Sequence, residues 1–282
     1  MRLLLAIALS CSTALCADPP LRLEFGVYPS DRASIMYRKF MPVLEALAEP
    51  LQQQLGRPVD IHLTIFKDYE DGIDALATGR VDFVRFGPAS YILAHERNED
   101  VALLAMELRK GRKRFNGLIV TRSDSGIRRL SDLTGKRFAF GDAHSTIGRY
   151  LAQAELLDAG LAADDLASYE YLGRHDLVAK AVIDGTHDAG ALKESTYRKM
   201  CLPEEVIVVK AYENVTKPWV ARGGLDERIQ SAITAALLEV EESAVLEELG
   251  CTGFTEADEQ DYAVIERRMK QAHAFEAPPS TD

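Results

Sequence analysis

The chain has 282 residues, of which 47% are hydrophobic and 27% are charged, and its formal net charge is -11. This length is enough for two ordinary domains, each with its own core. The excess of acidic residues argues against nucleic acid or an anionic membrane surface as a partner. It does not exclude a small anionic ligand, because donors and dipoles in a site that excludes water outweigh a distant net charge.

Residues 1–17, MRLLLAIALSCSTALCA, have the layout of a secretory signal: one arginine, an apolar run and then small residues. The run is shorter than the roughly 20 residues that span a bilayer. We predict cleavage near Ala17 or Asp18 and a periplasmic mature protein, with a lipid-modified Cys16 or Cys11 as the less favoured alternative. Two cysteines remain after cleavage, and a disulfide and a pair of buried thiols both stay open for them: Cys201 and Cys251.

The first third of the chain alternates strand and helix patterns, which is typical of an α/β lobe with a parallel sheet. The elements that we predict are a strand at 21–27, a helix up to Gly56 with Pro42 as its start and Pro50 as a kink, a strand at 59–65, a helix capped by Asp68, and a strand at 81–86.

The same alternation begins again after a basic segment and predicts a second α/β lobe. Its elements are strands at 118–121 and 136–140, a helix from about Thr146 to Ala159, a strand at 168–172, a helix at 176–183 and a strand at 189–192. Further strands at 206–209 and 219–221 and helices at 227–241 and 263–271 follow.

The fold class is therefore α/β with two lobes, and the cleft between the lobes is the default ligand site. We assign 18–108 plus 205–272 to lobe one, 109–204 to lobe two and 273–282 to a flexible tail. Two chain crossings, near 105–116 and 200–215, would join the lobes.

The segment from Phe140 to Gly148 lies between a strand and a helix and carries the sharpest local signal. Ser145 or Thr146 would cap the helix, whose first N–H groups have no partner within the helix. Free N–H donors, hydroxyls and the helix dipole together favour an anion there, and Gly148 would let a ligand approach the backbone. Plain helix capping is the alternative.

Two more strand ends belong to the same edge, since open α/β sheets bind ligands beyond the carboxyl ends of their strands. One is the end at Arg85, where Gly-Pro turns the chain and Ser90 and Tyr91 open a helix. The other places His175 at a helix start. The basic run at 109–114 is interpreted as a solvated loop between the lobes.

Taken together, these motifs resemble the phosphonate/phosphite/phosphate-binding family of periplasmic proteins that serve ABC transporters. The resemblance covers roughly residues 21–270 and rests on several spaced motifs: DY (68–69), FGPASY (86–91), GDAHSTIG (141–148), GRHD (173–176) and VIDGTHDAGA (182–191).

The resemblance implies a type II periplasmic-binding-protein fold, with no cofactor and no metal. It implies a monomer whose partners are a small anionic ligand and a transporter permease. From lobe two, Ser145, Thr146 and His175 would hold the phosphoryl oxygens. From lobe one, the closing side chains would be Tyr69, Ser90 and Tyr91, and Tyr28 after the first strand completes the set.

The chain departs from the family pattern at two positions, since Ile147 stands where the family often has serine and Phe115 where tyrosine is common. Arg85 is an additional cation, so a different anion or compensation by a guanidinium is indicated, with a structural salt bridge as the alternative. An amine-bearing phosphonate would need a carboxylate, for which Glu194 is the candidate; a helix-start acid is its alternative.

The sequence leaves two alternative classes of function open. A hydrolase could use Ser145 and His175, but Asp176 adjoins His175 and is poorly placed to orient its ring, and no nucleophile elbow is present. We therefore expect no catalytic residue, and no metal-type spacing is present either. A ligand-sensing subunit of a membrane signalling protein would use the same cleft, and the sequence does not separate it from a transporter component.

Overall fold

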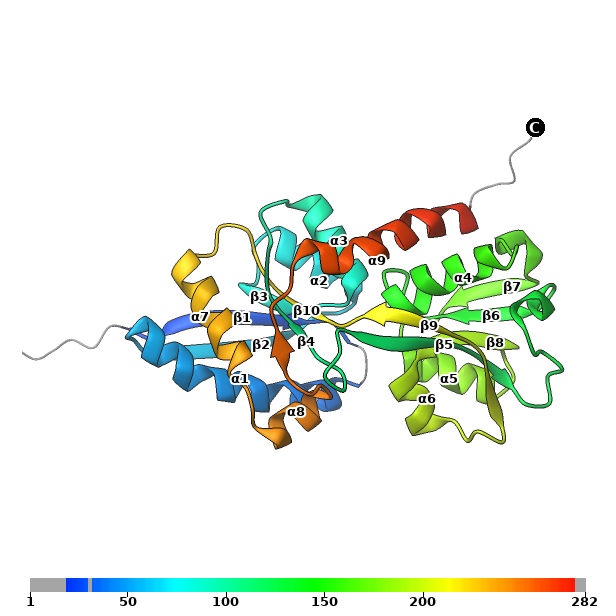
Figure 1. Ribbon diagram of the computed structural model, residues 1–282, viewed down its shortest axis with the longest axis horizontal. Coiled ribbons are helices and arrows are strands. Elements are labelled where there is room, and N and C mark those ends of the chain that lie inside the picture. Colours follow the sequence, from blue (N-terminus) through cyan, green and yellow to red (C-terminus); the bar gives the residue numbers. More distant parts are fainter. Residues whose placement is uncertain (1–18, 30–31, 277–282) are drawn as a thin grey trace, which may run out of the picture.

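The protein consists of two β-sheets, each with helices on both faces, that lie one after the other along the long axis (Figure 1). The structure is a computed structural model and describes residues 19–29 and 32–276. The predicted signal at 1–17, with Cys11 and Cys16, lies outside the described residues, as do residues 277–282. Among the described helices, none has both the length and the apolarity to cross a membrane.

The sheet of lobe one has six strands, and it is mixed rather than wholly parallel because β10 runs antiparallel to both of its neighbours. In spatial order the strands are β11 (Phe254–Thr255), β4 (Ala102–Glu107), β10 (Pro218–Ala221), β3 (Phe83–Arg85), β1 (Leu21–Val27) and β2 (Val59–Ile65).

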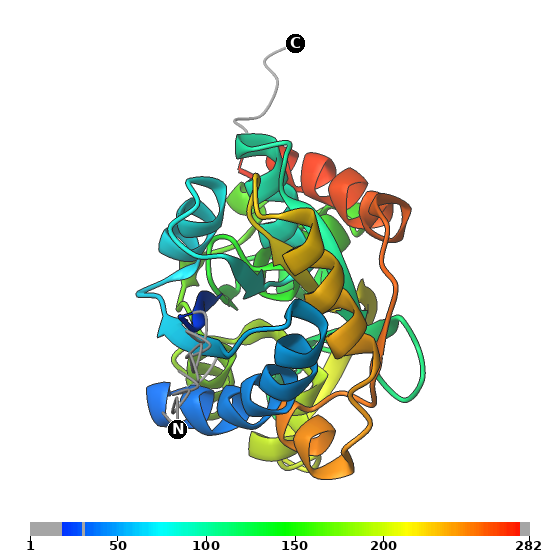
Figure 2. The same cartoon turned by 90° about the vertical axis from the view of Figure 1, so that its left-hand side faces the viewer.

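Helices cover both faces of this sheet, as the view from its end shows (Figure 2). One face carries α1 (Ala33–Leu55), α7 (Glu227–Leu238) and α8 (Ser243–Leu249), and the other carries α2 (Tyr69–Ala77) and α3 (Pro88–Arg97). Asp68 caps α2 as predicted, since its carboxylate accepts from the Asp71 N–H.

Helix α1 begins nine residues before Pro42, so the prediction that this proline starts the helix was wrong. Both prolines lie inside the helix. A buried apolar stripe that includes Met36, Phe40 and Leu47 packs on the sheet and outweighs the hydrogen bonds that the prolines remove.

The sheet of lobe two has five strands, again mixed because β5 runs antiparallel to β8 and β9. In spatial order they are β7 (Ser168–Tyr171), β6 (Arg137–Phe140), β8 (Ala189–Lys193), β5 (Arg114–Arg122) and β9 (Val206–Val215). A π-helical turn (Thr146–Leu151) that continues into α4 (Ala152–Asp158) covers one face, and α5 (His175–Ile183) and α6 (Glu194–Met200) cover the other.

The chain leaves lobe one between β4 and β5 and returns between β9 and β10, at Thr216 and Lys217. We predicted that 205–272 belongs to lobe one, whereas β9, at 206–215 within this range, pairs along its length with β5 in the second sheet. The β-branched residues of this segment predict a strand. They do not predict which sheet the strand joins, because that depends on its pairing with β5. The return crossing therefore lies at 216–217.

Helix α9 (Glu259–Ala272) links the lobes a third time, packing on α3 of lobe one and then on α4 and β9 of lobe two (Figure 1). Beyond it, residues 273–276 belong to the packed structure rather than to the predicted flexible tail. Phe275 is fully buried against Phe140 and Tyr169. Burial of this ring outweighs the polar composition that suggested disorder.

Candidate functional site

Five of the hydroxyl-bearing side chains predicted as ligand contacts meet between the lobes, and we call them the hydroxyl cluster: Tyr28, Tyr69, Ser90, Ser145 and Thr146. All five are buried. The rings of Tyr28 and Tyr69 stack with their centroids 3.6 Å apart, and the Tyr28 hydroxyl lies 2.9 Å from Ser90 Oγ. Burial raises the pKa of Tyr28 to about 12, so its hydroxyl stays protonated at neutral pH.

One hydrogen bond within lobe one and one between the lobes hold this cluster at the start of α3. The Gly87 N–H donates to the Tyr28 hydroxyl at 2.5 Å, and the Ala89 N–H donates to Thr146 Oγ1 at 2.9 Å. A Cβ atom on Gly87 would lie 3.1 Å from the Tyr28 hydroxyl and 3.2 Å from Thr146 Oγ1, so this close approach favours glycine. The N–H groups at the start of α3 could otherwise bind an anion, but here they donate to side-chain hydroxyls.

Ser145 caps the π-helical turn, since its Oγ accepts from the Gly148 N–H at 2.9 Å, and it also forms a hydrogen bond with Tyr69. Gly148 has a different role from the predicted approach of a ligand. A Cβ atom at position 148 would lie 2.8 Å from the Gly141 Cα. The close approach of the two backbone segments therefore requires glycine at this position.

His175 is buried at the first position of α5, and its Nδ1 has no hydrogen-bond partner among the described residues. Burial, together with the charges of Lys193 and Lys217, lowers the pKa of His175 well below its usual value. The ring is therefore neutral at neutral pH, with one nitrogen available to a ligand.

Tyr91 is not part of the hydroxyl cluster. Its ring packs on Tyr262 of α9, with the centroids 5.2 Å apart, and lies 6.0 Å from the ring of His95. One step along a helix separates it from Ser90, which turns its side chain to the face that packs on α9.

Arg85 forms a buried ion pair with Glu107, which agrees with the structural alternative for this residue. Its Nε donates to Glu107 Oε1 at 2.6 Å and its Nη2 donates to Oε2 at 2.9 Å. Burial alone would raise the pKa of Glu107, but the charge and hydrogen bonds of Arg85 hold it at about 2.

Beside this ion pair, a cavity of about 1040 Å³ opens between the lobes, and we call it the basic cavity. Among the described residues, eleven lysines and arginines line it against five carboxylates, although the whole chain has a net charge of -11. None of the hydroxyl cluster lines it. Its walls come from α1 and α8 of lobe one, from α6 of lobe two and from the crossings.

Four cations of the cavity influence one another, and we call them the inner cations: Lys39, Arg85, Lys193 and Lys217. Burial, followed by the charges of Arg85 and Lys193, lowers the pKa of Lys39 to about 7. Burial and the charge of Arg85 also lower the pKa of Lys217 well below its usual value. Clustered ammonium groups favour loss of a proton unless an anion lies close.

Residues from two other predictions, Glu194 and the basic run at 109–114, line this cavity. Glu194 lines its wall, where it pairs with Arg198 in the next turn of α6, as a helix-start acid would. The basic run, interpreted as a solvated loop, places Arg109, Lys110 and Arg112 on the cavity wall. It is the first crossing between the lobes, so its charge faces the cavity between them.

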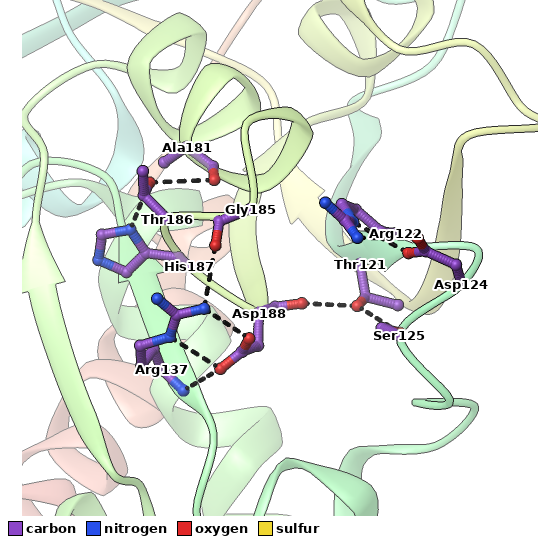
Figure 3. A network of polar contacts seen from close by, with 10 residues as sticks. All are labelled: Thr121, Arg122, Asp124, Ser125, Arg137, Ala181, Gly185, Thr186, His187 and Asp188. Carbon is purple, nitrogen blue, oxygen red and sulfur yellow. Dashed lines mark hydrogen bonds and ion pairs between the residues drawn. The ribbon is translucent and has the colours of Figure 1, made fainter.

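Residues of the VIDGTHDAGA motif (182–191) belong to a network of polar contacts, which Figure 3 shows. Asp188 accepts two side-chain hydrogen bonds from Arg137, which also donates to the Gly185 carbonyl, and the Thr121 hydroxyl donates to the Asp188 carbonyl. This network ties β5, β6 and β8 together at the end away from Lys193. The motif is thus structural in this chain.

No group of three or more histidine, cysteine or carboxylate side chains in the described part of the chain could hold a metal ion. The two cysteines are free and buried in different cores, Cys201 in lobe two and Cys251 in lobe one. Of the two outcomes that the sequence left open, the structure has the pair of buried thiols.

Two α/β lobes joined by strand crossings, with polar groups of both lobes meeting between them, define a two-lobed solute-binding protein. A family model described as the periplasmic substrate-binding protein of phosphonate ABC transporters matches residues 25–262. The chain belongs to this family, as its motifs indicated. It is a periplasmic-type substrate-binding protein of an ABC transporter.

Relatives agree with this assignment. A probable ABC transporter phosphite-binding protein of Prochlorococcus marinus is 24% identical over 270 residues, which is 88% of each chain. The solved structure of PhnD1 from that organism, in complex with methylphosphonate, has a TM-score of 0.77 at 22% identity and covers 91% of this chain and 100% of its own. XAC2383 from Xanthomonas citri, bound to chloride, gives a TM-score of 0.76 at 25% identity, over 89% and 97% of the two chains.

Sequence reasoning missed three inner cations: Lys39, Lys193 and Lys217. Lys193 ends β8 beside Glu194, and the rule on carboxyl ends of strands that selected Glu194 also applies to it. Lys39 lies within a long helix and Lys217 within a crossing, and no local pattern marks either of them. They become a group only when both lobes are in place.

Proposed function

We propose that the chain is exported to the periplasm, where it captures a small phosphorus oxyanion between its lobes and presents it to an ABC transporter permease. One relative named above is described as a probable phosphite-binding protein, and the PhnD1 structure is a complex with methylphosphonate. An oxyanion of this class would suit the neutral hydroxyl donors between the lobes of this chain. The protein would act as a monomer and would bind its ligand without converting it. The hydroxyl cluster is the observation that carries this proposal, because it unites donors from both lobes.

In the proposed complex, Ser145 and Thr146 donate to the anion from the helix start of lobe two. Tyr69, Tyr28 and Ser90 close on it from lobe one. His175 contributes through its unpartnered Nδ1. The anion would take over bonds that the hydroxyls now make with each other and with the N–H groups of α3, so binding would rearrange this part of the cleft.

A thermal-shift screen tests the ligand class with phosphite, phosphate, methylphosphonate, aminoethylphosphonate and sulfate. A ligand present at 100 times its Kd raises the free energy of unfolding by about 2.7 kcal/mol. A shift with phosphorus oxyanions and none with sulfate is the expected result. A shift with none of the phosphorus compounds would contradict the proposal.

Titration calorimetry with the ligand from this screen tests the residues. We expect Thr146→Ala and His175→Ala each to weaken binding about tenfold or more, because each removes a hydrogen bond to a charged group. Thr134→Ala, an exposed threonine of lobe two, is the control and should bind as the unmodified chain does.

The pH dependence supplies a second readout for His175. The ring is neutral before binding, and a bound anion favours its protonation, so binding takes up a proton and tightens as pH falls toward the lowered pKa. Unchanged affinity in both variants would place the anion elsewhere, with the end of β3 at Arg85 as the next position to examine.

A further inference from the structure

Two buried polar side chains near the return crossing, which runs from β9 to β10, have no hydrogen-bond partner among the described residues (Figure 1). Asn214, near the end of β9, is 2% exposed and its Oδ1 accepts from no donor; Thr216, just beyond the strand, is 1% exposed with an unpaired Oγ1. The sequence predicted neither residue as a ligand contact. Buried polar atoms in native proteins are almost always paired, so these two atoms indicate a group that binds beside them.

The topology of lobe two places both residues at the edge of its sheet where the predicted ligand contacts lie. Strands β6, β7 and β8 are parallel, and β5 runs antiparallel to both β8 and β9. Strand β9 therefore points in the same direction as β6, β7 and β8. Its carboxyl end, with Asn214 and Thr216, lies at the edge where Ser145 follows β6 and His175 follows β7.

The side chain of Asn214 faces the π-helical turn of the site. Alternate residues of a strand point to one face, so Asn214 shares a face of β9 with Tyr212, whose hydroxyl donates to the Ile147 carbonyl at 2.8 Å. The turn begins at Thr146 and continues into α4, which returns the chain to the amino edge of the sheet. Since β9 runs in the opposite direction, Asn214 lies toward the start of the turn.

A backbone hydrogen bond fixes the return crossing beside the start of α3. The Phe86 N–H donates to the Pro218 carbonyl at 3.0 Å, two residues beyond Thr216. Phe86 adjoins Gly87, whose N–H donates to the Tyr28 hydroxyl of the hydroxyl cluster. The crossing thus passes from the π-helical turn to the start of α3, and Thr216 lies between the two.

The unpaired atoms are of a kind that accepts a hydrogen bond. The amide oxygen of Asn214 only accepts, and the hydroxyl of Thr216 accepts as well as donates. An anion held by donors elsewhere in the site needs a donor of its own to satisfy such an acceptor. Phosphorus oxyanions keep an acidic P–OH proton near neutral pH, whereas sulfate is fully ionised. An acceptor beside the anion therefore disfavours sulfate, because it stays buried and unpaired in that complex.

We propose that Asn214 and Thr216 are ligand-binding residues that accept a hydrogen bond from the P–OH group of a phosphorus oxyanion and so discriminate against fully ionised anions such as sulfate. The inference rests on the proposed function and deepens it, since Ser145 and Thr146 hold the charged oxygens while the two acceptors recognise the proton. Neither acceptor carries a charge, so the discrimination depends on the proton rather than on the total charge of the anion.

Titration calorimetry of the mature chain at about pH 6.5 tests the proposal with three groups of anions. Phosphite, phosphate and methylphosphonate carry a P–OH group, aminoethylphosphonate adds an ammonium group, and sulfate and monofluorophosphate have no acidic proton at this pH. We expect the tightest of the first three to bind about tenfold or more tightly than sulfate and monofluorophosphate. Monofluorophosphate that binds as tightly as this anion would overturn the proposal, whether or not the variants below fold.

Two variants of similar shape test the residues themselves. Asn214→Leu and Thr216→Val should each weaken binding of the tightest P–OH anion about tenfold and change sulfate binding less than about twofold. Removing a buried unpaired atom should leave the melting temperature of the free protein unchanged or raise it, which separates a ligand contact from a structural role. Thr134→Val, at an exposed position of lobe two, is the control and should bind as the unmodified chain does.

The outcomes separate this inference from the proposed function. If the unmodified chain binds none of the phosphorus oxyanions, the proposed function fails and this inference fails with it. If the chain binds one of them and both acceptor variants bind it equally well, only this inference fails. A loss of affinity confined to aminoethylphosphonate would assign the acceptors to an ammonium group and overturn the P–OH assignment.

Discussion

The interface between the lobes has two halves that differ in almost every physical respect. In the half beside α3 and α9, hydroxyls and aromatic rings pack closely, and one apolar core runs on from lobe one into lobe two. In the half beside α1, α6 and α8, cations surround an open cavity and the lobes have separate cores.

This difference between the two halves corresponds to two physical ways of attracting an anion. Hydroxyl and N–H donors are directional and act over a hydrogen-bond distance, so they select the shape of a small oxyanion. Clustered ammonium groups act over a longer range and select charge more than shape. The first half should therefore be sensitive to single atoms, and the second half to pH and salt.

The largest expected effect concerns the ion pair at the boundary between the halves. Arg85→Met leaves the Glu107 carboxylate buried without a partner, so we expect it to lower the free energy of unfolding by about 3–5 kcal/mol. Urea unfolding followed by circular dichroism measures this change. The double variant Arg85→Met/Glu107→Leu should recover most of the loss, and a loss below about 1 kcal/mol in the single variant would show that Glu107 finds another partner.

A smaller effect is expected within the packed half. Tyr28→Phe removes the acceptor of the Gly87 N–H and the partner of Ser90, so it should cost about 1–3 kcal/mol of unfolding free energy. Tyr91→Phe is a matched control, because Tyr91 is equally buried at 4% exposure and its hydroxyl lies outside the cluster. Equal melting temperatures for the two variants would contradict the role given to the Tyr28 hydroxyl.

The open half should respond to pH. Burial lowers the pKa of Lys39 to about 7 in the folded protein, below its value in the unfolded chain, so unfolding takes up a proton above pH 7. Groups that influence Lys39 are Arg85, Lys193, Glu107 and Arg109. The free energy of unfolding should therefore rise from pH 7 toward pH 9, by up to about 1.4 kcal/mol per pH unit.

Urea unfolding at several pH values between 7 and 9 measures this change. Lys39→Arg keeps its charge throughout this range, so its free energy of unfolding should depend less on pH. The same dependence on pH in this variant as in the unmodified chain would show that Lys39 does not titrate in this range.

The smallest effect is expected from the cysteines, and it tests whether a disulfide joins the two lobes. Burial raises the pKa of Cys201 to about 11, and Cys251 is also buried with a raised pKa. Both thiols should react with a thiol reagent only after unfolding, without a reductant. Failure to find two free thiols in the unfolded mature chain would indicate an oxidised pair.

Several local features followed from the sequence because neighbours along the chain decide them. The Asp68 cap and the strand at 21–27 need only a side-chain oxygen or an alternating pattern. The assignment of Ser145 to a helix start needs only the change from strand to helix pattern after Phe140. The motifs around these residues also predicted the family correctly.

The tertiary structure decided which of these side chains meet and what surrounds them. Ser90 joins the hydroxyl cluster and Tyr91 packs on α9, although they are adjacent in the sequence, because one helical step turns them to different neighbours. Lys39, Lys193 and Lys217 lie up to 178 residues apart, and the packing of the two lobes brings them around one cavity. Sequence patterns report burial and capping over a few residues, whereas a ligand site between lobes depends on contacts across the whole chain.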